Sequence, residues 1–425
     1  MLLKFTVENY LSFKNKSTLD FSAGSIKEYK DNVSPTPFSN GPGILKSLGI
    51  FGHNASGKSN MIKGMSFVRD FILNSSKDNT TSREIPLEPF RLAIESEEQP
   101  SSFEIIFILE NIRYRYGFSL TPKAIESEWL FKTEKRKEEN LFVRAKQNFS
   151  FEKEFKNSLK GKFELVYEMT KNNSLFLSVL SQFNYALCLN ISNWFSKIII
   201  AHDTEHATLI DFTAKLMSMG EYRKLINDVI KKSDLGIDSV EERLKESAVK
   251  SNLSYELISS VFADDIRQYT VRTSHTKYKN DKSHDKVFFD LLKSESLGTQ
   301  KFFGVLGPLL YTIKEKGIIW IDEIDARMHS LLVLDVISLF NSKKTNSNGA
   351  QLIFTSHNTN ILKKGLRRDQ MIFIDKDKFG ISSIESLYSK DPKVRKDATF
   401  DKDYLSGKYG AIPGLGSQLD LFGNL

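Results

Sequence analysis

The pattern of apolar and polar positions changes along the chain, and each stretch predicts a different kind of structure. Leu2–Tyr10 alternates with period two, as do residues 103–109 and 112–120 on either side of a two-residue polar break. Such alternation is typical of strands with one buried face, and the short break predicts a hairpin. With a further strand over 124–132, these positions predict a β-rich N-terminal lobe.

Short, continuously apolar runs mark a second kind of element. Ile318–Ile321 and Leu352–Thr355 have the composition of central parallel strands buried on both faces, with a helix over 330–341 between them. Leu45–Phe51 and Met371–Ile374 predict further short strands. Strands that alternate with helices in this way predict an α/β fold.

Between these two patterns, residues 141–290 show helical spacing with few strong breakers. Apolar residues from Leu175 to Ile191 form one helical face, and residues 194–200 continue the apolar character. We therefore expect a helical insertion within the α/β fold. The predicted parts are 1–140 (N-terminal part with the β-lobe), 141–290 (helical insertion), 291–385 (C-terminal part of the α/β domain) and 386–425 (tail).

The segment Gly52–Ser59, GHNASGKS, matches the phosphate-loop pattern G-x-x-x-x-G-K-[ST] at every required position. Gly52 and Gly57 let the backbone bend so that its amides point at phosphate oxygens. Lys58 reaches the β- and γ-phosphates, and the Ser59 hydroxyl ligates Mg²⁺. A buried strand before the loop and a helix after it, over about 59–74, argue against a chance match. The segment predicts binding of a nucleoside triphosphate with Mg²⁺.

Two acidic residues, Asp322 and Glu323, directly follow the apolar run Ile318–Ile321. Asp322 is placed to hold Mg²⁺, and Glu323 to polarise the attacking water. The alternative is an ordinary strand end with solvated acids.

Two further motifs lie near this acid pair in the sequence. The segment Glu295–Lys301, ESLGTQK, precedes a predicted helix over 302–313 and is either a second anion site or a plain helix cap. His357, in TSHN after the strand Leu352–Thr355, is positioned to reach the γ-phosphate or the attacking water, although a lone histidine is more often structural.

The order of loop, signature, acid pair and histidine resembles an ATP-binding-cassette (ABC) ATPase of the RecF/SMC kind within the AAA superfamily. Gly52–Asn60 and the opening Val7–Phe13 carry this resemblance. Residues 295–299, 321–325 with His329, and 404–413 are similar to the RloA/AbiL group of abortive-infection ATPases. The resemblance implies a P-loop NTPase fold, namely an ABC-type ATPase head with an N-terminal β-rich lobe and a helical insertion.

The resemblance also implies a head-to-tail homodimer, or a higher even-numbered assembly, with ATP held between subunits. Ser296 and Gly298 of one subunit would then contact the γ-phosphate held by Lys58 of the other, and Asp325 would lie in the loop that links the two sites. The remaining loop residues expected to bind nucleotide are Asn54, Ser56 and Asn60. The expected catalytic residues are Glu323, His357 and Lys58. The glutamine that couples the sites in the family is unassigned here, because Gln99 lies in a polar turn.

Composition changes this picture only slightly. The 425 residues are 40% hydrophobic, which is enough for a sizeable core, and the net charge is +7. A mildly basic chain permits contact with nucleic acid without requiring it. The single cysteine, Cys188, excludes a disulfide framework and a cysteine-based metal site.

Several charged clusters are candidates for other chemistry. The basic residues at 363–368 and 393–396 are either nucleic-acid contacts or solvated surface. Asp375-Lys376-Asp377 imitates a nuclease motif, but too little chain follows for such a domain, so we expect a turn over 375–380. His202-Asp203 with His206 lacks a fourth metal ligand, and we expect a solvated loop.

No signal-peptide pattern opens the chain and no apolar run approaches about 20 residues, so we expect a soluble, cytoplasmic protein with no membrane partner. The leading hypothesis is an ATP-hydrolysing sensor or regulatory subunit of a prokaryotic anti-phage (abortive-infection) system that controls a toxic effector, such as a nuclease. The alternative is a RecF/SMC-like DNA-binding ATPase in DNA repair or chromosome maintenance. A transport ATPase is the third option, and the N-terminal strands disfavour it.

Overall fold

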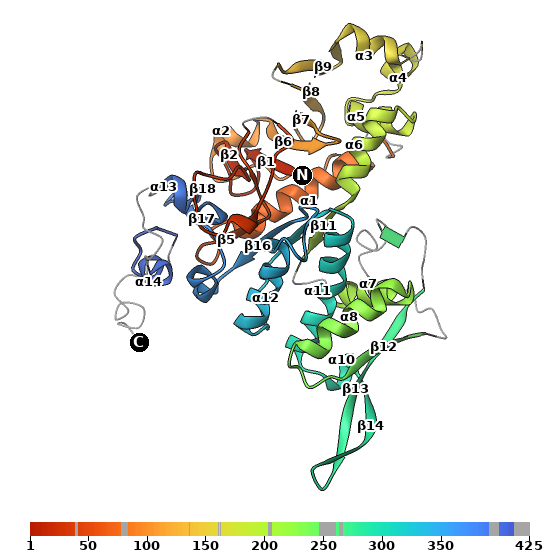
Figure 1. The fold of residues 1–425 in the computed structure, drawn as a ribbon. Coiled ribbons are helices and arrows are strands. Elements are labelled where there is room, and N and C mark those ends of the chain that lie inside the picture. The colour runs from red at the N-terminus through yellow and green to blue at the C-terminus, as the bar shows by residue number, and fades with distance from the viewer. Residues whose placement is uncertain are drawn as a thin grey trace. The chain divides into compact units, whose positions relative to one another are not determined.

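The computed structural model describes residues 1–38, 41–77, 84–135, 137–159, 161, 163–202, 206–245, 261–262, 267–390 and 399–411 (Figure 1). The chain divides into two compact units, which we name by the motif that each carries. The loop unit comprises Leu2–Ser192 and Thr355–Leu425, and the signature unit comprises Asn193–Phe354 with Met1. The divisions fall within the helix Ala186–Ser196 (α6) and the strand Gln351–Ser356 (β16).

The loop unit contains an antiparallel sheet in the order β10-β9-β8-β7-β6-β1-β2 among the described residues. Its strands are β1 (Leu2–Glu8), β2 (Ser17–Asp20), β6 (Ser101–Leu109), β7 (Ile112–Leu120), β8 (Ile125–Thr133), β9 (Glu139–Ala145) and β10 (Asn148–Phe151). The predicted hairpin is β6–β7, and both residues of its turn, Glu110 and Asn111, have positive φ of 51° and 63°. This geometry matches the turn type that fits the twist of paired strands.

A second group of strands in the loop unit leads to the phosphate loop. The strand β5 (Ser47–Phe51) is buried along its whole length and pairs in parallel with β17 (Met371–Lys376). The strand β18 (Ser382–Ser386) pairs antiparallel with β17, and β3 (Val33–Ser34) pairs with β4 (Ile44–Leu45). The long helix α1 (Lys58–Asn74) follows the loop, and its Phe67 and Phe71 pack against aromatic rings of β6 and β7. This packing joins the helix to the antiparallel sheet.

Shorter elements complete the loop unit. They are η1 (Lys30–Asn32), α2 (Ile94–Glu97), α3 (Lys153–Ser158), α4 (Phe163–Met169), α5 (Phe176–Gln182), η3 (Thr359–Lys363), η4 (Arg368–Gln370), α13 (Leu387–Lys390) and α14 (Phe400–Leu405). A buried carboxylate fixes α5, because Glu128 accepts hydrogen bonds from the backbone amides of Phe176 (2.7 Å) and Leu177 (3.0 Å). Arg144 lies 3.6 Å from this carboxylate, and both side chains are fully buried. The pair therefore ties α5 to strands β8 and β9.

The signature unit has a parallel sheet and an antiparallel sheet. In the first, β11 (Ile198–Ala201) and β16 flank β15 (Ile318–Ile321) in parallel. In the second, β12 (Ser239–Leu244) and β14 (Lys282–Asp290) flank β13 (Tyr269–Lys279). The helices are α7 (His206–Ser218), α8 (Glu221–Lys232), α10 (Leu291–Ser294), α11 (Leu297–Lys314) and α12 (Ser330–Asn341).

The helices α7 and α11 approach closely at one glycine. A Cβ on Gly307 would lie 2.4 Å from the Thr213 Oγ1 atom, so the contact requires a residue without a side chain. The Thr213 hydroxyl also donates to the Gly304 carbonyl at 2.8 Å. This contact fixes the helix that carries the signature motif at its start.

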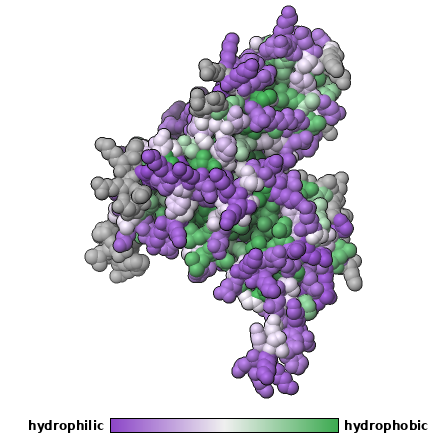
Figure 2. Space-filling model, in the orientation of Figure 1, coloured by the Kyte–Doolittle hydropathy of each residue, from purple (hydrophilic) through white to green (hydrophobic). Residues whose placement is uncertain are grey.

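The range 141–290 differs from the expected helical insertion. It contains helices α3 to α8, but also most of β9, strands β10 and β11, and the sheet β12–β14. The apolar residues Ile198–Ala201 are fully buried and form a strand that pairs in parallel with β15. The strands β13 and β14 have mostly polar, exposed residues toward their tip, so no apolar alternation marks them (Figure 2).

Most of the other expected elements are present. The predicted strands at 318–321, 352–355 and 371–374 lie within β15, β16 and β17, and the predicted helix at 330–341 is α12. No helix in the described ranges is long and apolar enough to cross a membrane.

Candidate nucleotide and signature sites

The phosphate loop connects β5 to α1 and is shaped by two glycines. A Cβ on Gly52 would lie 2.4 Å from the Ile374 carbonyl oxygen. Gly57 caps α1 with φ of 115°, and a Cβ there would lie 2.4 Å from the Ser382 hydroxyl oxygen. Both positions therefore exclude a side chain, and Gly57 also has a backbone conformation that favours glycine. The loop ends at the start of a long helix, whose first amides favour an anion.

Lys58 folds over the loop that precedes it. Its Nζ atom donates to the carbonyls of Gly52 and His53, each at 2.9 Å, and its side chain is buried. Ser59 is half-buried in the first turn of α1, and Asn54 is exposed within the loop. The cation and the helix start are thus held together at one end of β5.

Hydroxyl groups from distant segments support the loop. The side-chain amide of Asn60 (Nδ2) donates to the Ser12 hydroxyl oxygen (2.8 Å), which lies 2.8 Å from the Ser382 hydroxyl oxygen. The Ser382 oxygen is in turn 2.5 Å from the Ser56 carbonyl oxygen. Because a carbonyl only accepts, Ser382 gives its single proton to Ser56, and Ser12 donates to Ser382. Asn60 therefore begins a chain that ends on the loop backbone.

Two further observations concern the loop side chains. The Ser56 hydroxyl oxygen is buried and has no hydrogen-bond partner among the described residues. The His53 Nε2 atom lies 3.6 Å from the Asp375 Oδ1 atom at the end of β17.

The C-terminal motif lies against the same strand. Tyr404 and Tyr409 stack on Phe373 of β17, with ring centroids 5.3 and 5.6 Å away. Part of the C-terminal motif 404–413 thus lies against the strand beside the phosphate loop, while residues 412 and 413 are outside the described ranges.

His357 follows the end of β16, as the sequence predicts, and its side chain is exposed. The neighbouring Asn358 caps η3 by accepting from the Asn360 amide at 3.0 Å. The position is that of a side chain at a strand end, and a role on the γ-phosphate stays a prediction.

The acid pair begins a tight turn after β15 in the signature unit. The Asp322 amide donates to the Ala201 carbonyl (3.0 Å), which aligns the turn with the neighbouring strand β11. Glu323 has φ of 48°, and its carbonyl accepts from the Ala326 amide at 3.0 Å. The Asp325 Oδ1 atom is buried and has no hydrogen-bond partner in the part of the chain that the structure describes. It is an acceptor without a donor.

The signature turn packs against this acid turn. The Ser296 hydroxyl caps α11 by accepting from the Thr299 backbone amide at 3.1 Å. This contact is the one expected of an ordinary helix cap. A Cβ on Gly298 would lie 2.4 Å from the Arg327 carbonyl oxygen. The buried Lys301 donates to the Glu323 carbonyl at 2.7 Å. The structure therefore brings the signature and the acid pair together within one unit.

Comparison with known protein families places these motifs in one domain. Residues 47–363 match a family model described as "AAA domain, putative AbiEii toxin, Type IV TA system". The chain belongs to this AAA-domain family. The match covers the phosphate loop, the signature turn, the acid turn and His357, so the fold of the chain is that of an α/β P-loop NTPase.

Comparisons with curated proteins and with solved structures add little to this family assignment. No curated protein matches it by sequence. Among solved structures, 75 chains match, including an SMC head domain from Thermotoga maritima at 14% identity and a TM-score of 0.40. That match covers 91% of this chain and 98% of the other.

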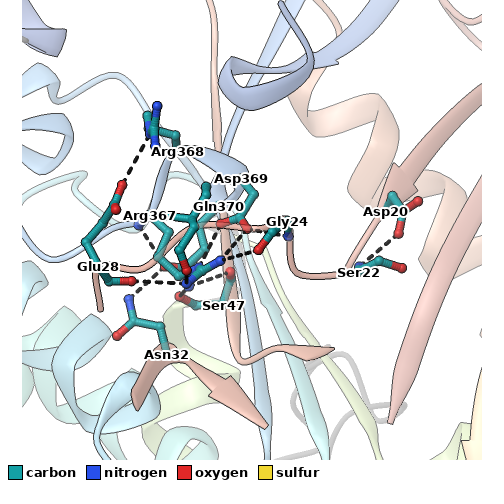
Figure 3. A network of polar contacts seen from close by, with 11 residues as sticks. Asp20, Ser22, Gly24, Glu28, Asn32, Ser47, Arg367, Arg368, Asp369 and Gln370 are labelled. Atoms are coloured by element: carbon teal, nitrogen blue, oxygen red, sulfur yellow. Dashed lines mark hydrogen bonds and ion pairs between the residues drawn. The ribbon is translucent and has the colours of Figure 1, made fainter. Parts of the chain in front are cut away.

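Two of the basic residues at 363–368, Arg367 and Arg368, make structural contacts within the protein (Figure 3), whereas Lys363 and Lys364 are exposed. Arg367 is buried and donates to both oxygens of Asp369 (2.9 and 2.7 Å) and to carbonyls of the segment 24–28. Arg368 pairs with Glu28 at 3.2 Å. Arg367 is therefore closed to a phosphate backbone, because its donors are used inside the protein. The cluster at 393–396 lies outside the described residues.

The remaining predicted sites are quickly placed. Asp377 closes the expected turn by accepting from the amides of Phe379 and Ile381, both at 2.9 Å. Asp203 of the histidine cluster is not among the described residues. Burial raises the pKa of the Cys188 thiol well above its usual range, so this cysteine stays protonated. Gln99 is exposed, and its carbonyl accepts from Asn9 at 2.8 Å.

Sequence reasoning missed the residues that hold the two motifs in place. Ser12 and Ser382 lie 370 positions apart, and nothing local in the sequence connects them. Lys301 was visible as a lysine one turn into an apolar helix, and a buried lysine there requires an acceptor.

Proposed function

We propose that this AAA domain binds and hydrolyses ATP with Mg²⁺. The observation that carries the proposal is the phosphate loop, where Lys58 and the start of α1 are held at the end of a buried strand, and two glycines leave no room for side chains. A cation beside the N-terminus of a long helix favours a polyphosphate. The family assignment supports the same reading.

The chain's own residues then have distinct roles in the proposed reaction. Lys58 binds the β- and γ-phosphates, Glu323 orients and deprotonates the attacking water, and His357 binds the γ-phosphate. Ser59 and Asp322 offer the oxygen ligands that Mg²⁺ prefers, and the bound ion would neutralise phosphate charge. Asn54 and Ser56 would complete the nucleotide contacts, whereas Asn60 supports the loop.

We further propose that two copies associate head to tail, so that Ser296 and Gly298 of one copy contact the ATP bound by the other. Leu297, between them, has an exposed fraction of 55%, as suits a surface that a second subunit covers. Asp325 would link the two sites, and its unpartnered buried oxygen supports a contact still to be made. ATP binding would then join the subunits and hydrolysis would release them.

The biological role that we propose is control of a toxic effector in an abortive-infection system, in the manner of the RloA/AbiL group and in the cytoplasm. The family description, with its toxin and type IV toxin–antitoxin system, supports a role in this area. The effector is expected to be a separate protein, such as a nuclease.

The test is the light-scattering mass of Glu323→Gln with and without Mg-ATP, together with ATP turnover by the wild type. We expect the variant to lose turnover and to form an ATP-dependent dimer or larger even-numbered assembly. A variant that stays monomeric and still hydrolyses ATP would overturn both the role of Glu323 and the shared site.

The alternative, a DNA-binding ATPase of the RecF/SMC kind, loses one of its supports, because Arg367 of the predicted basic cluster is buried and paired. ATP-dependent duplex binding that weakens with salt, in the absence of any effector, would nonetheless favour it.

A further inference from the structure

The β13–β14 hairpin of the signature unit has no role in the proposed reaction, yet its base contacts the signature turn. The hairpin extends from the β12–β14 sheet (Figure 1), and β14 leads through the short helix α10 directly into Glu295. The Glu295 Oε1 atom accepts from the Thr273 hydroxyl at 2.5 Å and lies 2.8 Å from the His275 Nε2 atom. Both partners belong to β13, about twenty residues upstream. We call these two contacts the Glu295 clamp.

The clamp is well shielded from water. Thr273 is fully buried, and the side chains of Glu295 and His275 have exposed fractions of 12% and 23%. The His275 ring packs edge-on against Phe289 of β14 at 5.2 Å, so both strands of the hairpin hold it. Hydrogen bonds to a shielded carboxylate are stronger than those between neutral groups, so the clamp resists rotation of Glu295.

On its other side, Glu295 is bonded to the signature helix. The side-chain amide of Gln300 (Nε2) donates to the Glu295 carbonyl at 2.9 Å. One residue later, Lys301 donates to the carbonyl of the catalytic candidate Glu323. The segment from Glu295 to Lys301 is thus fixed at one end by the hairpin and at the other by the acid turn, with Ser296 and Gly298 between them.

We propose that Glu295 is a positioning residue for the signature turn, and that the β13–β14 hairpin controls ATP turnover through the Glu295 clamp. Glu295 itself touches no nucleotide. It sets the direction in which Ser296 and Gly298 face a second subunit. The inference rests on the proposed function, since only a signature turn that contacts ATP makes its orientation matter for turnover.

The exposed tip of the hairpin supplies a matched control. Tyr278 lies on the same strand as Thr273 and His275, has an exposed fraction of 66% and makes no contact with Glu295. Removing its side chain changes the same hairpin without touching the clamp.

The experiment uses the full chain and compares wild type, Glu295→Ala, Glu295→Gln, the double variant Thr273→Val with His275→Ala, and Tyr278→Ala. It measures kcat and KM for ATP, ADP affinity by calorimetry, Tm, and amide hydrogen exchange of peptides covering 296–301. Because ADP lacks the γ-phosphate that Ser296 and Gly298 contact in our proposal, its affinity reports the phosphate loop without the signature turn.

For Glu295→Ala and the double variant we expect kcat to fall about tenfold, a loss of the size that one misplaced group causes. Exchange over 296–301 rises and Tm falls slightly, because the buried Thr273 hydroxyl loses its acceptor, while ADP affinity stays close to wild type. Glu295→Gln keeps an acceptor for both donors and recovers most of kcat, and Tyr278→Ala resembles wild type throughout.

Unchanged kcat and unchanged exchange in Glu295→Ala would overturn the proposal. Parallel losses of ADP affinity, Tm and kcat would also overturn it, because they would show a general structural role. Absence of turnover in the wild type would instead count against the proposed function. The exchange result would then still decide whether the clamp positions the turn.

Discussion

The phosphate loop and the signature turn are both short, glycine-containing segments that lead into long helices, but they are stabilised differently. The loop cation is held by the loop itself, since Lys58 bonds to carbonyls five and six positions before it, although the distant Ser12 and Ser382 hydroxyls also support the loop. The signature turn depends on Thr273 and His275, which reach it from another sheet. A motif that is stabilised by neighbouring residues in the sequence can be predicted from the sequence. A motif that is stabilised by a distant strand can be controlled through that strand.

The largest expected effect tests how local the support of the loop really is. Arg367→Ala removes the partner of the buried Asp369 and should lower the free energy of unfolding by about 3–5 kcal/mol, measured by urea denaturation. Lys363→Ala is the control, because its ion pair with Asp401 is half-exposed and should contribute under about 1 kcal/mol. Equal effects in the two variants would mean that the network of Figure 3 does not support the strands beside the loop.

Next in size is the loss of the loop cation. Lys58→Ala should weaken ATP binding about 100-fold, or about 2.7 kcal/mol, because charged hydrogen bonds to phosphate disappear. Calorimetry with ATP measures this, and Lys63→Ala, an exposed lysine on the same helix, should bind normally. Retained affinity in Lys58→Ala would show that the loop is not the phosphate site.

Two glycine variants test whether the phosphate loop and the signature turn have separate roles. In Gly57→Ala and Gly298→Ala, the new Cβ meets an oxygen at 2.4 Å, and Gly57 is strained in addition by its φ of 115°. We expect Gly57→Ala to weaken ADP binding about tenfold, and Gly298→Ala to lower kcat about tenfold with normal ADP binding. The same pattern in both variants would mean that the two motifs do not act separately.

The smallest effect concerns the hydroxyl chain under the loop. Ser12→Ala leaves Asn60 and Ser382 each without one partner and should lower stability by about 1 kcal/mol, with a modest loss of ATP affinity. Thermal unfolding measures this, with Ser66→Ala on α1 as the control. No change would show that Ser12 is dispensable to the loop.

The parts of the fold that were predictable have local signals. The strand β15 is four apolar residues followed by acids, and the phosphate loop carries its glycines and lysine within eight positions. Burial also explains β11, but residues 198–200 follow a helical pattern in the sequence, which predicts that the helical region continues through them. The same kind of apolar run forms a strand or part of a helix according to its neighbours in space.

The candidate site shows the same limit. The positions of Lys58, Ser296 and Asp322 at element ends follow from spacing, whereas the Glu295 clamp requires knowledge of which strand lies beside the turn. The cluster at 363–368 shows that a basic residue expected at the surface can be buried. Burial of Arg367 depends on the carbonyls of a loop more than 300 residues away, which the local sequence does not reveal. Charge alone did not distinguish a surface from an interior.

The hydrogen bonds of Lys58 to two carbonyls have a consequence for ligand selectivity. A nucleotide that binds Lys58 must compete with these carbonyls, so association is an exchange of acceptors. Phosphoryl oxygens that carry a full charge compete well against a neutral carbonyl, whereas uncharged ligands compete poorly. Discrimination between a triphosphate and a nucleoside is therefore built into the resting contacts of one side chain, before any contact to the base or the sugar is made.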